Sequence, residues 1–184
     1  MAYFAGIDWS MNSPGICVYD NTKELCFENC FFFVYTKNKQ QKRNKNIFFM
    51  NHIPYNSEYE RFDNISEWAM AIIKKFKIYE VGIEGYSFGS KSSSLFNIAE
   101  NCGVLKHKLW KNQTNIKQYA PSEIKKFFSG KGNANKEYMF NTLLTNESID
   151  LIDMLGIKTY ESPVSDIVDS YAILKLLMRD IYEK

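Results

Sequence analysis

The sequence predicts an α/β fold in which a mixed five-stranded sheet is flanked by helices. The first 36 residues contain three short apolar runs separated by turn residues, which is typical of an antiparallel β-meander. From Ser57 onward, apolar residues recur every three or four positions, which indicates an amphipathic helix. Strand-like and helix-like segments then alternate, so helices can cover the sheet.

The N-terminal meander is defined by its turns. Residues 3–9 and 15–20 are apolar runs joined by Asn-Ser-Pro-Gly, so they predict a hairpin. Residues 24–36 alternate in part and are rich in Phe and Tyr, which predicts a third strand. Residues 47–53 could add an edge strand.

A basic stretch interrupts the pattern after the third strand. Residues 37–56 are interpreted as an insertion or loop within a single domain that spans residues 1–184, because no linker or repeat divides the chain. The basic residues in it are Lys37, Lys39, Lys42, Arg43 and Lys45.

The rest of the chain alternates between helix and strand. Residues 57–77 have helical spacing, and residues 79–84 form a short apolar run that ends in an acid. Pro121 suits the first turn of a short helix. The remaining predicted elements are a strand at 115–119 and helices at 92–111, 121–128, 136–145 and 164–183.

Composition excludes several classes of protein. With 45% hydrophobic and 24% charged residues, the 184-residue chain resembles an ordinary globular domain rather than a disordered one. The N-terminus lacks a secretory leader, and no apolar run approaches the roughly 18 residues of a membrane span, so we expect a cytoplasmic protein with no membrane partner. Four cysteines without a C-x-x-C pair, and two distant histidines, argue against zinc.

Charge distribution is more informative than the net charge of +2, which alone is a weak sign of nucleic-acid binding. Besides the basic stretch, a second group of lysines comprises Lys125, Lys126, Lys131 and Lys136. If four acids held two divalent cations, the protein would behave as though its charge were about +6, which suits a polyanion.

Four acids form the candidate site. Asp8 and Glu84 each end an apolar strand, while Asp166 and Asp169 lie three residues apart on one face of the last helix. Such a cluster repels itself unless cations compensate. Hard oxygen ligands suit two Mg²⁺ ions, with Mn²⁺ as a substitute, and two ions about 4 Å apart support phosphodiester cleavage.

Each acid also has a structural interpretation. Asp8 could be an ordinary residue at a strand-to-turn junction, and Glu84 a solvated strand end. Asp166 could cap the last helix, with Asp169 supporting its first turn.

Four segments together resemble the RuvC family of Holliday-junction resolvases, most closely its small phage-encoded members. They are GIDWSMNSPGICVYD, VGIEGYSFGSK, APSEIKKFFSGKGNANK and SDIVDSYAIL. The resemblance covers nearly the whole chain apart from residues 37–56. It implies a ribonuclease H-like fold, a homodimer, and paired symmetric nicks that resolve four-way DNA junctions and leave 5′-phosphate ends. It places the catalytic, metal-binding acids at Asp8, Glu84, Asp166 and Asp169.

The resemblance also implies roles for basic and aromatic residues. Lys125 and Lys136 fall where the family has basic residues that hold the phosphate or balance charge, although both could be solvated. A family aromatic that wedges into the junction corresponds to Tyr86 or Phe88, which flank Ser87 and could instead be buried under a loop. Further DNA contacts are expected from Lys42, Arg43, Lys91 and Lys131.

The predicted helix at 92–111 is the expected dimer interface. A two-fold dimer matches the approximate two-fold symmetry of a four-way junction. Four apolar residues on one side of this helix could form the interface or pack on the sheet, namely Leu95, Ile98, Cys102 and Leu105.

Three alternatives stay open. The first strand and turn also resemble the phosphate hairpin of actin-like sugar kinases, but the chain is short and lacks a second Gly-rich hairpin, so we expect no nucleotide cofactor. A catalytically silent junction-binding protein could retain the fold. Within the nucleases, flaps or forks could be preferred to four-way junctions.

Overall fold

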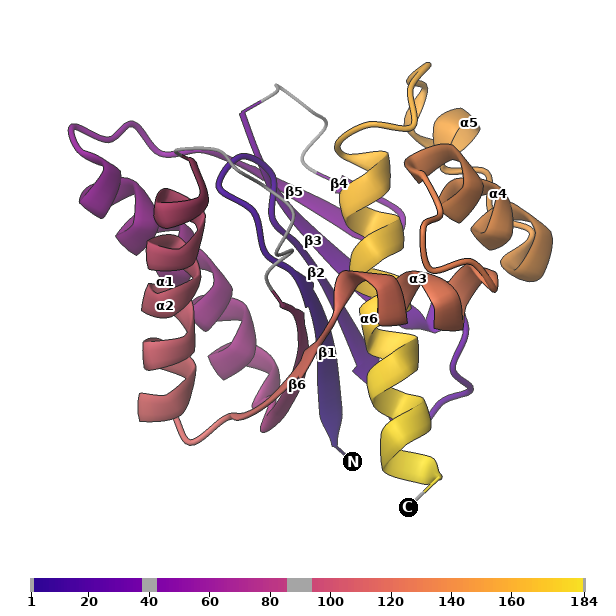
Figure 1. The fold of residues 1–184 in the computed structure, drawn as a ribbon, viewed down its shortest axis with the longest axis horizontal. Coiled ribbons are helices and arrows are strands. Elements are labelled where there is room, and N and C mark those ends of the chain that lie inside the picture. Colours follow the sequence, from indigo (N-terminus) through magenta and orange to yellow (C-terminus); the bar gives the residue numbers. More distant parts are fainter. Residues whose placement is uncertain (1, 38–42, 86–93, 184) are drawn as a thin grey trace.

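A mixed β-sheet runs through the molecule with helices on both faces (Figure 1). The computed structural model describes residues 2–37, 43–85 and 94–183. Within that part of the chain the sheet has seven strands in the order β4-β5-β3-β2-β1-β6-β7. The strands are β1 (Tyr3–Asp8), β2 (Gly15–Asp20), β3 (Cys30–Thr36), β4 (Arg43–Asn44), β5 (Ile47–Asn51), β6 (Glu80–Glu84) and β7 (Asn115–Tyr119).

The helices form two outer layers. α1 and α2 pack together on one face, and α6 with α3 and α4 covers the other (Figure 1). The helices are α1 (Glu58–Phe76), α2 (Ser94–Lys111), α3 (Pro121–Ser129), α4 (Lys136–Glu147), α5 (Leu151–Leu155) and α6 (Val164–Tyr182), with a 3-10 turn η1 (Phe27–Asn29) before β3.

The strands bury both of their faces, so the molecule has a core on each side of the sheet. Along β1, Phe4 faces the core beneath α6, whereas Ala5 and Ile7 face the core beneath α1 and α2. Along β2, Cys17 faces the core beneath α6 and Val18 faces the core beneath α1 and α2. Side chains alternate between the faces of a strand, and helices on both faces therefore explain why these strands are apolar throughout.

Helix α6 is buried around most of its circumference and lies directly on β1. A Cβ atom at Gly6 would stand only 2.2 Å from the backbone oxygen of Ser170 and 2.4 Å from the backbone nitrogen of Leu174. Any other residue at position 6 would push the helix away from the strand. This close approach brings the start of α6 to the end of β1.

The expected fold class is confirmed, but the expected sheet of five strands is wrong in its count. Part of the basic stretch forms β4 and β5 beyond β3, and β5 pairs parallel with β3. Ring stacking explains why these two strands join the sheet. The ring centroids of Phe48 and Phe33 are 5.1 Å apart, and the Arg43 guanidinium lies 5.0 Å from the Phe48 centroid. The strand expected at 47–53 ends at Asn51, and its expected edge position is wrong because β4 pairs outside it.

Other boundaries also differ from expectation. The third strand, expected from residue 24, begins at Cys30, because Phe27 turns into the core within η1. The predicted helix at 92–111 is described from Ser94. Helix α5 was not predicted, since five residues are too few to show helical periodicity.

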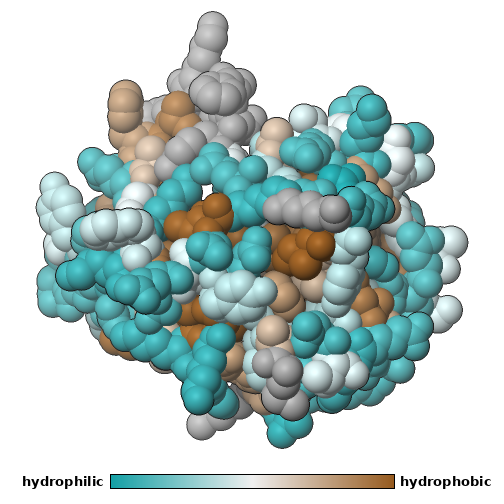
Figure 2. All heavy atoms as spheres, turned by 90° about the horizontal axis from the view of Figure 1, so that it is seen from below, coloured by the Kyte–Doolittle hydropathy of each residue, from teal (hydrophilic) through white to brown (hydrophobic). Residues whose placement is uncertain are grey.

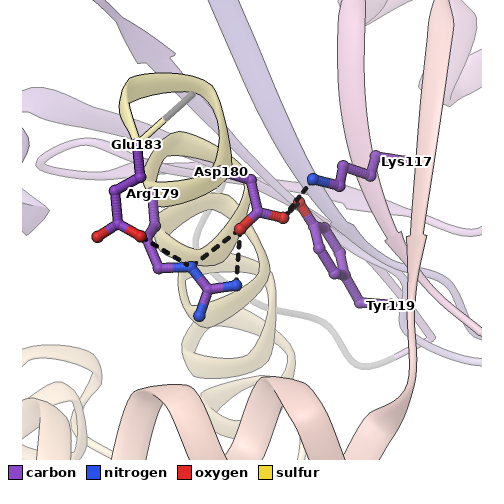
Figure 3. Close-up of polar contacts among 5 residues, drawn as sticks. All are labelled: Lys117, Tyr119, Arg179, Asp180 and Glu183. Atoms are coloured by element: carbon purple, nitrogen blue, oxygen red, sulfur yellow. Dashed lines mark hydrogen bonds and ion pairs between the residues drawn. The ribbon is translucent and has the colours of Figure 1, made fainter.

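A polar network joins the end of α6 to edge strand β7 (Figure 3). Asp180 accepts hydrogen bonds from Lys117, from Tyr119 Oη at 3.0 Å and from Arg179 at 2.6 Å. Burial alone would raise the pKa of Asp180, but these hydrogen bonds outweigh burial and lower it to about 2. The network therefore fixes the C-terminal half of α6 against the sheet.

The end of the molecule where β1 begins and α6 ends has a mostly hydrophilic surface with small hydrophobic patches (Figure 2). Among the described residues, no helix combines the length and hydrophobicity needed to cross a bilayer.

Candidate active site

Three elements bring the four predicted acids to the same edge of the sheet. Asp8 is the last residue of β1 and Glu84 the last residue of β6. These strands are parallel neighbours, paired in register up to Ile7 and Ile83, so both acids leave the sheet at its carboxyl edge. Asp166 and Asp169 arrive on the first turns of α6.

The carboxylates are close enough to perturb one another. Burial raises the pKa of Asp8 well above its ordinary value, and the charges of Asp169, Asp166 and Glu84 raise it further, while Lys136 opposes them. Burial and the charges of Glu84 and Asp166 raise the pKa of Asp169 to about 7. Ionised together, these groups repel strongly, so the site favours either protons or bound cations.

Glu84 is also perturbed. Burial raises the pKa of Glu84, and the charge of Lys125 partly offsets the effect. Glu84 is therefore partly removed from solvent, and the interpretation of it as a solvated strand end is wrong.

Asp166 is held by hydroxyl groups. It accepts hydrogen bonds from Ser13 Oγ at 2.6 Å and from Ser162 Oγ. Burial raises the pKa of Asp166 while these hydrogen bonds lower it. The alternative that Asp166 caps the helix is wrong, because Pro163 occupies the N-cap position and Asp166 lies within the first turn.

Sequence reasoning did not identify Ser13, Ser162 or the glycines that admit α6. Gly15 pairs with Asp8 across the hairpin, and a Cβ atom there would meet the backbone oxygen of Asp166 at 2.5 Å. Ser13 and Gly15 lie in the Asn-Ser-Pro-Gly turn, where they satisfied turn preferences and gave no separate signal.

A cleft of about 660 Å³ opens beside the acids. Asp8 and Glu84 lie on its wall, and helices α1, α2 and α3 contribute the opposite sides. Its other lining residues are Trp9, Ser10, Met11, Asn12, Arg61, Gly85, Leu95, Ile98, Cys102, Pro121 and Lys125. The cleft gives a ligand access to two of the four carboxylates.

The chemistry of these residues fits a divalent cation, although their spacing is not that of an assembled coordination shell. Within residues 2–37, 43–85 and 94–183, no three His, Cys, Asp or Glu side chains have the spacing of a metal site. The carboxylates are nevertheless partly buried, mutually repelling oxygen donors, which is the environment that Mg²⁺ or Mn²⁺ would stabilise.

The predicted basic residues have different surroundings. Lys125, on α3, lines the cleft. Lys136 begins α4, forms an ion pair with Glu161, and acts electrostatically on Asp8 and Asp169. Lys131 is exposed and its Nζ lies 4.2 Å from the centre of the Tyr138 ring.

Of the remaining predicted DNA contacts, the structure describes only Arg43. Arg43 lies on β4, where Nε donates a hydrogen bond to the Lys45 carbonyl at 3.0 Å. The other four fall outside the described residues, namely Lys42, Tyr86, Phe88 and Lys91.

The predicted interface residues of α2 divide between two environments. Cys102 and Leu105 are buried in the core under α1 and α2, so they are core residues. Leu95 and Ile98 line the cleft, and Ile98 is exposed.

Comparison with known proteins gives the family. The family model of the crossover junction endodeoxyribonuclease RuvC matches residues 28–173, which is more than half of the chain. The chain belongs to the RuvC family. Glu84, Asp166 and Asp169 lie within the matched residues, whereas Asp8 and Ser13 precede them. The assignment of Asp8 to the candidate site therefore rests on its position at the end of β1.

Curated relatives are similar over part of their length. A RuvC from Brachyspira hyodysenteriae is 33% identical over 97 residues, covering 51% of this chain and 61% of the relative. A RuvC from Helicobacter pylori is 28% identical over 105 residues, covering 53% of this chain and 67% of the relative. The matches thus span about two thirds of these relatives. The closer likeness to phage-encoded members stays a prediction.

A solved structure agrees over the full chain. Thermus thermophilus RuvC in complex with a Holliday junction substrate superposes with a TM-score of 0.64 at 19% identity, covering all of this chain and 95% of that one. At this identity the likeness shows the fold. It supports the ribonuclease H-like architecture expected for a RuvC-family protein.

Proposed function

We propose that this chain is a metal-dependent endonuclease that resolves four-way DNA junctions by paired symmetric nicks and leaves 5′-phosphate ends. The observation that carries the proposal is the convergence of four mutually repelling carboxylates, from β1, β6 and α6, beside an open cleft in a RuvC-family chain. The Thermus thermophilus relative, solved with a Holliday junction, supports the choice of substrate.

The acids are the proposed metal ligands. Asp8, Glu84, Asp166 and Asp169 would hold two Mg²⁺ ions, for which Mn²⁺ would substitute. When bound, the ions would supply an activated water and stabilise the departing 3′ oxygen. Ser13 and Ser162 hold Asp166 in place by hydrogen bonds, so its carboxylate does not have to be ordered when DNA arrives.

Two lysines complete the proposed centre. Lys125 is positioned at the cleft beside Glu84, and Lys136 lies near Asp8 and Asp166. Both would balance negative charge that accumulates as the phosphate is attacked. Arg43 and Lys131 would add contacts to the phosphate backbone, which supply affinity more than selectivity.

The proposed homodimer would use the outer surface of α1 and α2. Three large aromatic side chains there are exposed, namely Tyr59, Phe96 and Trp110, with exposed fractions of 79%, 75% and 70%. Between the helices lies a groove of about 490 Å³ with mainly apolar walls, which include Phe62 and Val104. A second copy related by two-fold symmetry would cover these groups and present two cutting sites.

A cleavage assay tests the proposal. A labelled synthetic four-way junction is incubated with the protein in Mg²⁺ or in chelator, alongside flap, fork and linear duplex substrates. We expect symmetric cuts only with Mg²⁺ and preferentially in the four-way junction. Preference for flaps or forks would correct the substrate, and junction binding with no cleavage in any condition would support the silent alternative.

The Asp8→Asn variant assigns the activity to the site. Loss of one proposed metal ligand should abolish cutting and leave junction affinity largely intact, because phosphate contacts supply most of that affinity. Full activity in this variant would reject the proposed site.

A further inference from the structure

The loop of residues 9–14, which joins β1 to β2, adjoins one of the four acids and forms a hydrogen bond with another. Asp8 precedes the loop directly, and Ser13 within it donates the 2.6 Å hydrogen bond to Asp166, which is 153 residues away in the chain. Ser13 is itself held locally, since its backbone N–H donates to Ser10 Oγ at 3.0 Å. The conformation of this loop therefore affects both carboxylates.

Arg61 on α1, which is not one of the clustered acids, forms hydrogen bonds with this loop. Its Nη2 donates hydrogen bonds to the Met11 carbonyl and to Asn12 Oδ1, each at 2.7 Å. Its Nη1 contacts Glu58 at 3.2 Å, and its guanidinium lies 5.4 Å from the centre of the Tyr55 ring. The Arg61 side chain is only 8% exposed, so solvent cannot replace these partners easily.

A second set of contacts holds the same loop from the β3 and β5 side. His52 Nε2 donates a hydrogen bond to the Asn12 carbonyl at 2.9 Å, and the His52 ring stacks on Tyr35 with centroids 4.4 Å apart. The Tyr35 N–H donates to the Pro14 carbonyl at 3.1 Å. The connection after β5, which the sequence left without a role, thus helps to hold the loop.

The geometry at Arg61 suits a guanidinium rather than a simple positive charge. Glu58, its carboxylate partner, is 44% exposed, so that ion pair is partly screened by solvent. Arg61 makes its contacts from two nitrogens at once, Nη2 to the loop and Nη1 to Glu58, and a lysine ammonium has a single nitrogen. Arg61 also lines the cleft that holds Asp8 and Glu84.

We propose that Arg61 is a positioning residue, which holds the 9–14 loop so that Ser13 orients Asp166 and Asp8 faces the cleft. Arg61 acts through the loop and needs no contact with the reacting phosphate. The part of the inference that concerns cleavage rests on the proposed nuclease function, while the effect on the loop can be tested without DNA or metal.

Hydrogen exchange of the metal-free protein tests the effect on the loop. Arg61→Met should speed exchange of amides in a peptide that covers residues 9–14 and leave peptides from β6 and β7 unchanged. Arg61→Lys keeps the charge and should give the same change to a smaller extent. The control is Lys23→Met, an exposed cation just beyond the opposite end of β2, which should leave the loop peptide unchanged. Unchanged loop exchange in Arg61→Met, or uniformly faster exchange, would overturn the proposal.

Single-turnover cleavage of a four-way junction at saturating enzyme tests the consequence. Arg61→Met should cut about 10- to 100-fold more slowly, since small displacements of catalytic groups have effects of this size. Junction affinity in chelator should stay within about twofold, and Lys23→Met should cut at the wild-type rate. A fall in affinity equal to the fall in rate would make Arg61 a DNA contact and reject the positioning role.

A double-mutant cycle separates action through the loop from independent effects. Arg61 is not among the hydrogen-bond partners of Ser13, so coupling between them must pass through the loop. Ser13→Ala should slow cleavage, and adding Arg61→Met should cause a smaller further loss than the same change causes in the wild type, because only the effect on Asp8 remains. Fully additive losses would contradict the proposal. If the wild type cut no branched DNA, the proposed nuclease function would be rejected. The hydrogen-exchange result would still show whether Arg61 holds the 9–14 loop.

Discussion

The backbone of Asp166 lies so close to Gly15 that a Cβ atom on this glycine would stand 2.5 Å from the Asp166 carbonyl oxygen. Gly15 also pairs with Asp8 across the β1–β2 hairpin. One residue without a side chain thus allows an acid on a strand and an acid on a helix to approach one another. The distance between the two carboxylates depends on how closely α6 can approach the hairpin.

Gly15→Ala should therefore displace the start of α6. We expect the free energy of unfolding to fall by about 1–3 kcal/mol, as for overpacked sites, and junction cleavage to fall more than junction affinity. The matched control is Gly103→Ala on α2, where no atom lies within 4 Å of the added methyl group. That variant should be as stable as the wild type or more stable in the same urea titration. Equal stability of both variants would show that α6 tolerates displacement.

Lys136 should matter for cleavage more than for stability. Its ion pair with Glu161 is exposed, with side-chain exposures of 49% and 68%, so the pair should contribute about 0–1 kcal/mol. Lys136→Met should slow single-turnover cleavage by about 10²-fold or more through loss of charge near the acids. Glu161→Gln is the control, because it removes the pair and keeps the lysine. An equal loss of rate in Glu161→Gln would make the pair itself the functional unit.

The Asp180 network should make stability depend on pH in the acidic range. The pKa of Asp180 is about 2 in the folded protein, below its ordinary value near 3.8. Its contribution is therefore complete above about pH 4 and is lost as the pH falls toward 2. Asp180→Asn should be about 1–2 kcal/mol less stable at pH 7, and the difference from wild type should shrink between pH 4 and pH 2.

Urea unfolding at a series of pH values measures this dependence. The control is Glu183→Gln, because Glu183 is 72% exposed and lies 3.9 Å from Arg179 in the same network. It should change stability by less than about 0.5 kcal/mol. A pH-independent difference between Asp180→Asn and wild type would mean that packing, rather than charge, explains the loss.

The basic stretch should contribute to DNA affinity by neutralising phosphates. Replacing its lysines and arginine with glutamine should weaken junction binding and flatten its dependence on salt, by roughly 0.9 in the logarithmic slope for each phosphate that is no longer neutralised. The residues are Lys37, Lys39, Lys42, Arg43 and Lys45. Lys74 and Lys75, at the opposite end of α1 from Arg61, provide a control. An unchanged salt slope would leave the stretch as solvated surface.

Local patterns predicted the strands and helices that carry the acids. Asp8 and Glu84 could be found because each ends a buried apolar run, and strand ends are a local signal. The pair Asp166 and Asp169 was ambiguous, because acids are also common in the first turn of a helix. Only the docking of α6 on the hairpin separates the two interpretations.

Long-range relationships were not predictable in the same way. The parallel pairing of β5 with β3 leaves no periodic signature in a five-residue strand. The hydrogen bond from Ser13 to Asp166 joins residues 153 positions apart, and serine in a turn is already explained by local preference. Arg61 was hidden within an amphipathic helix, where an arginine is expected on the solvent side, although here it is buried.

The position of α6 in the chain has a consequence for protein synthesis. Every strand of the described sheet precedes α6, and Asp166 and Asp169 reach the other acids only when this helix docks on β1. A chain that has not yet been extended to α6 contains Asp8 and Glu84 but lacks the other half of the acid cluster. Domains generally fold as units once the interacting segments are available. The proposed cutting centre therefore becomes complete only after α6 has been synthesised and has docked.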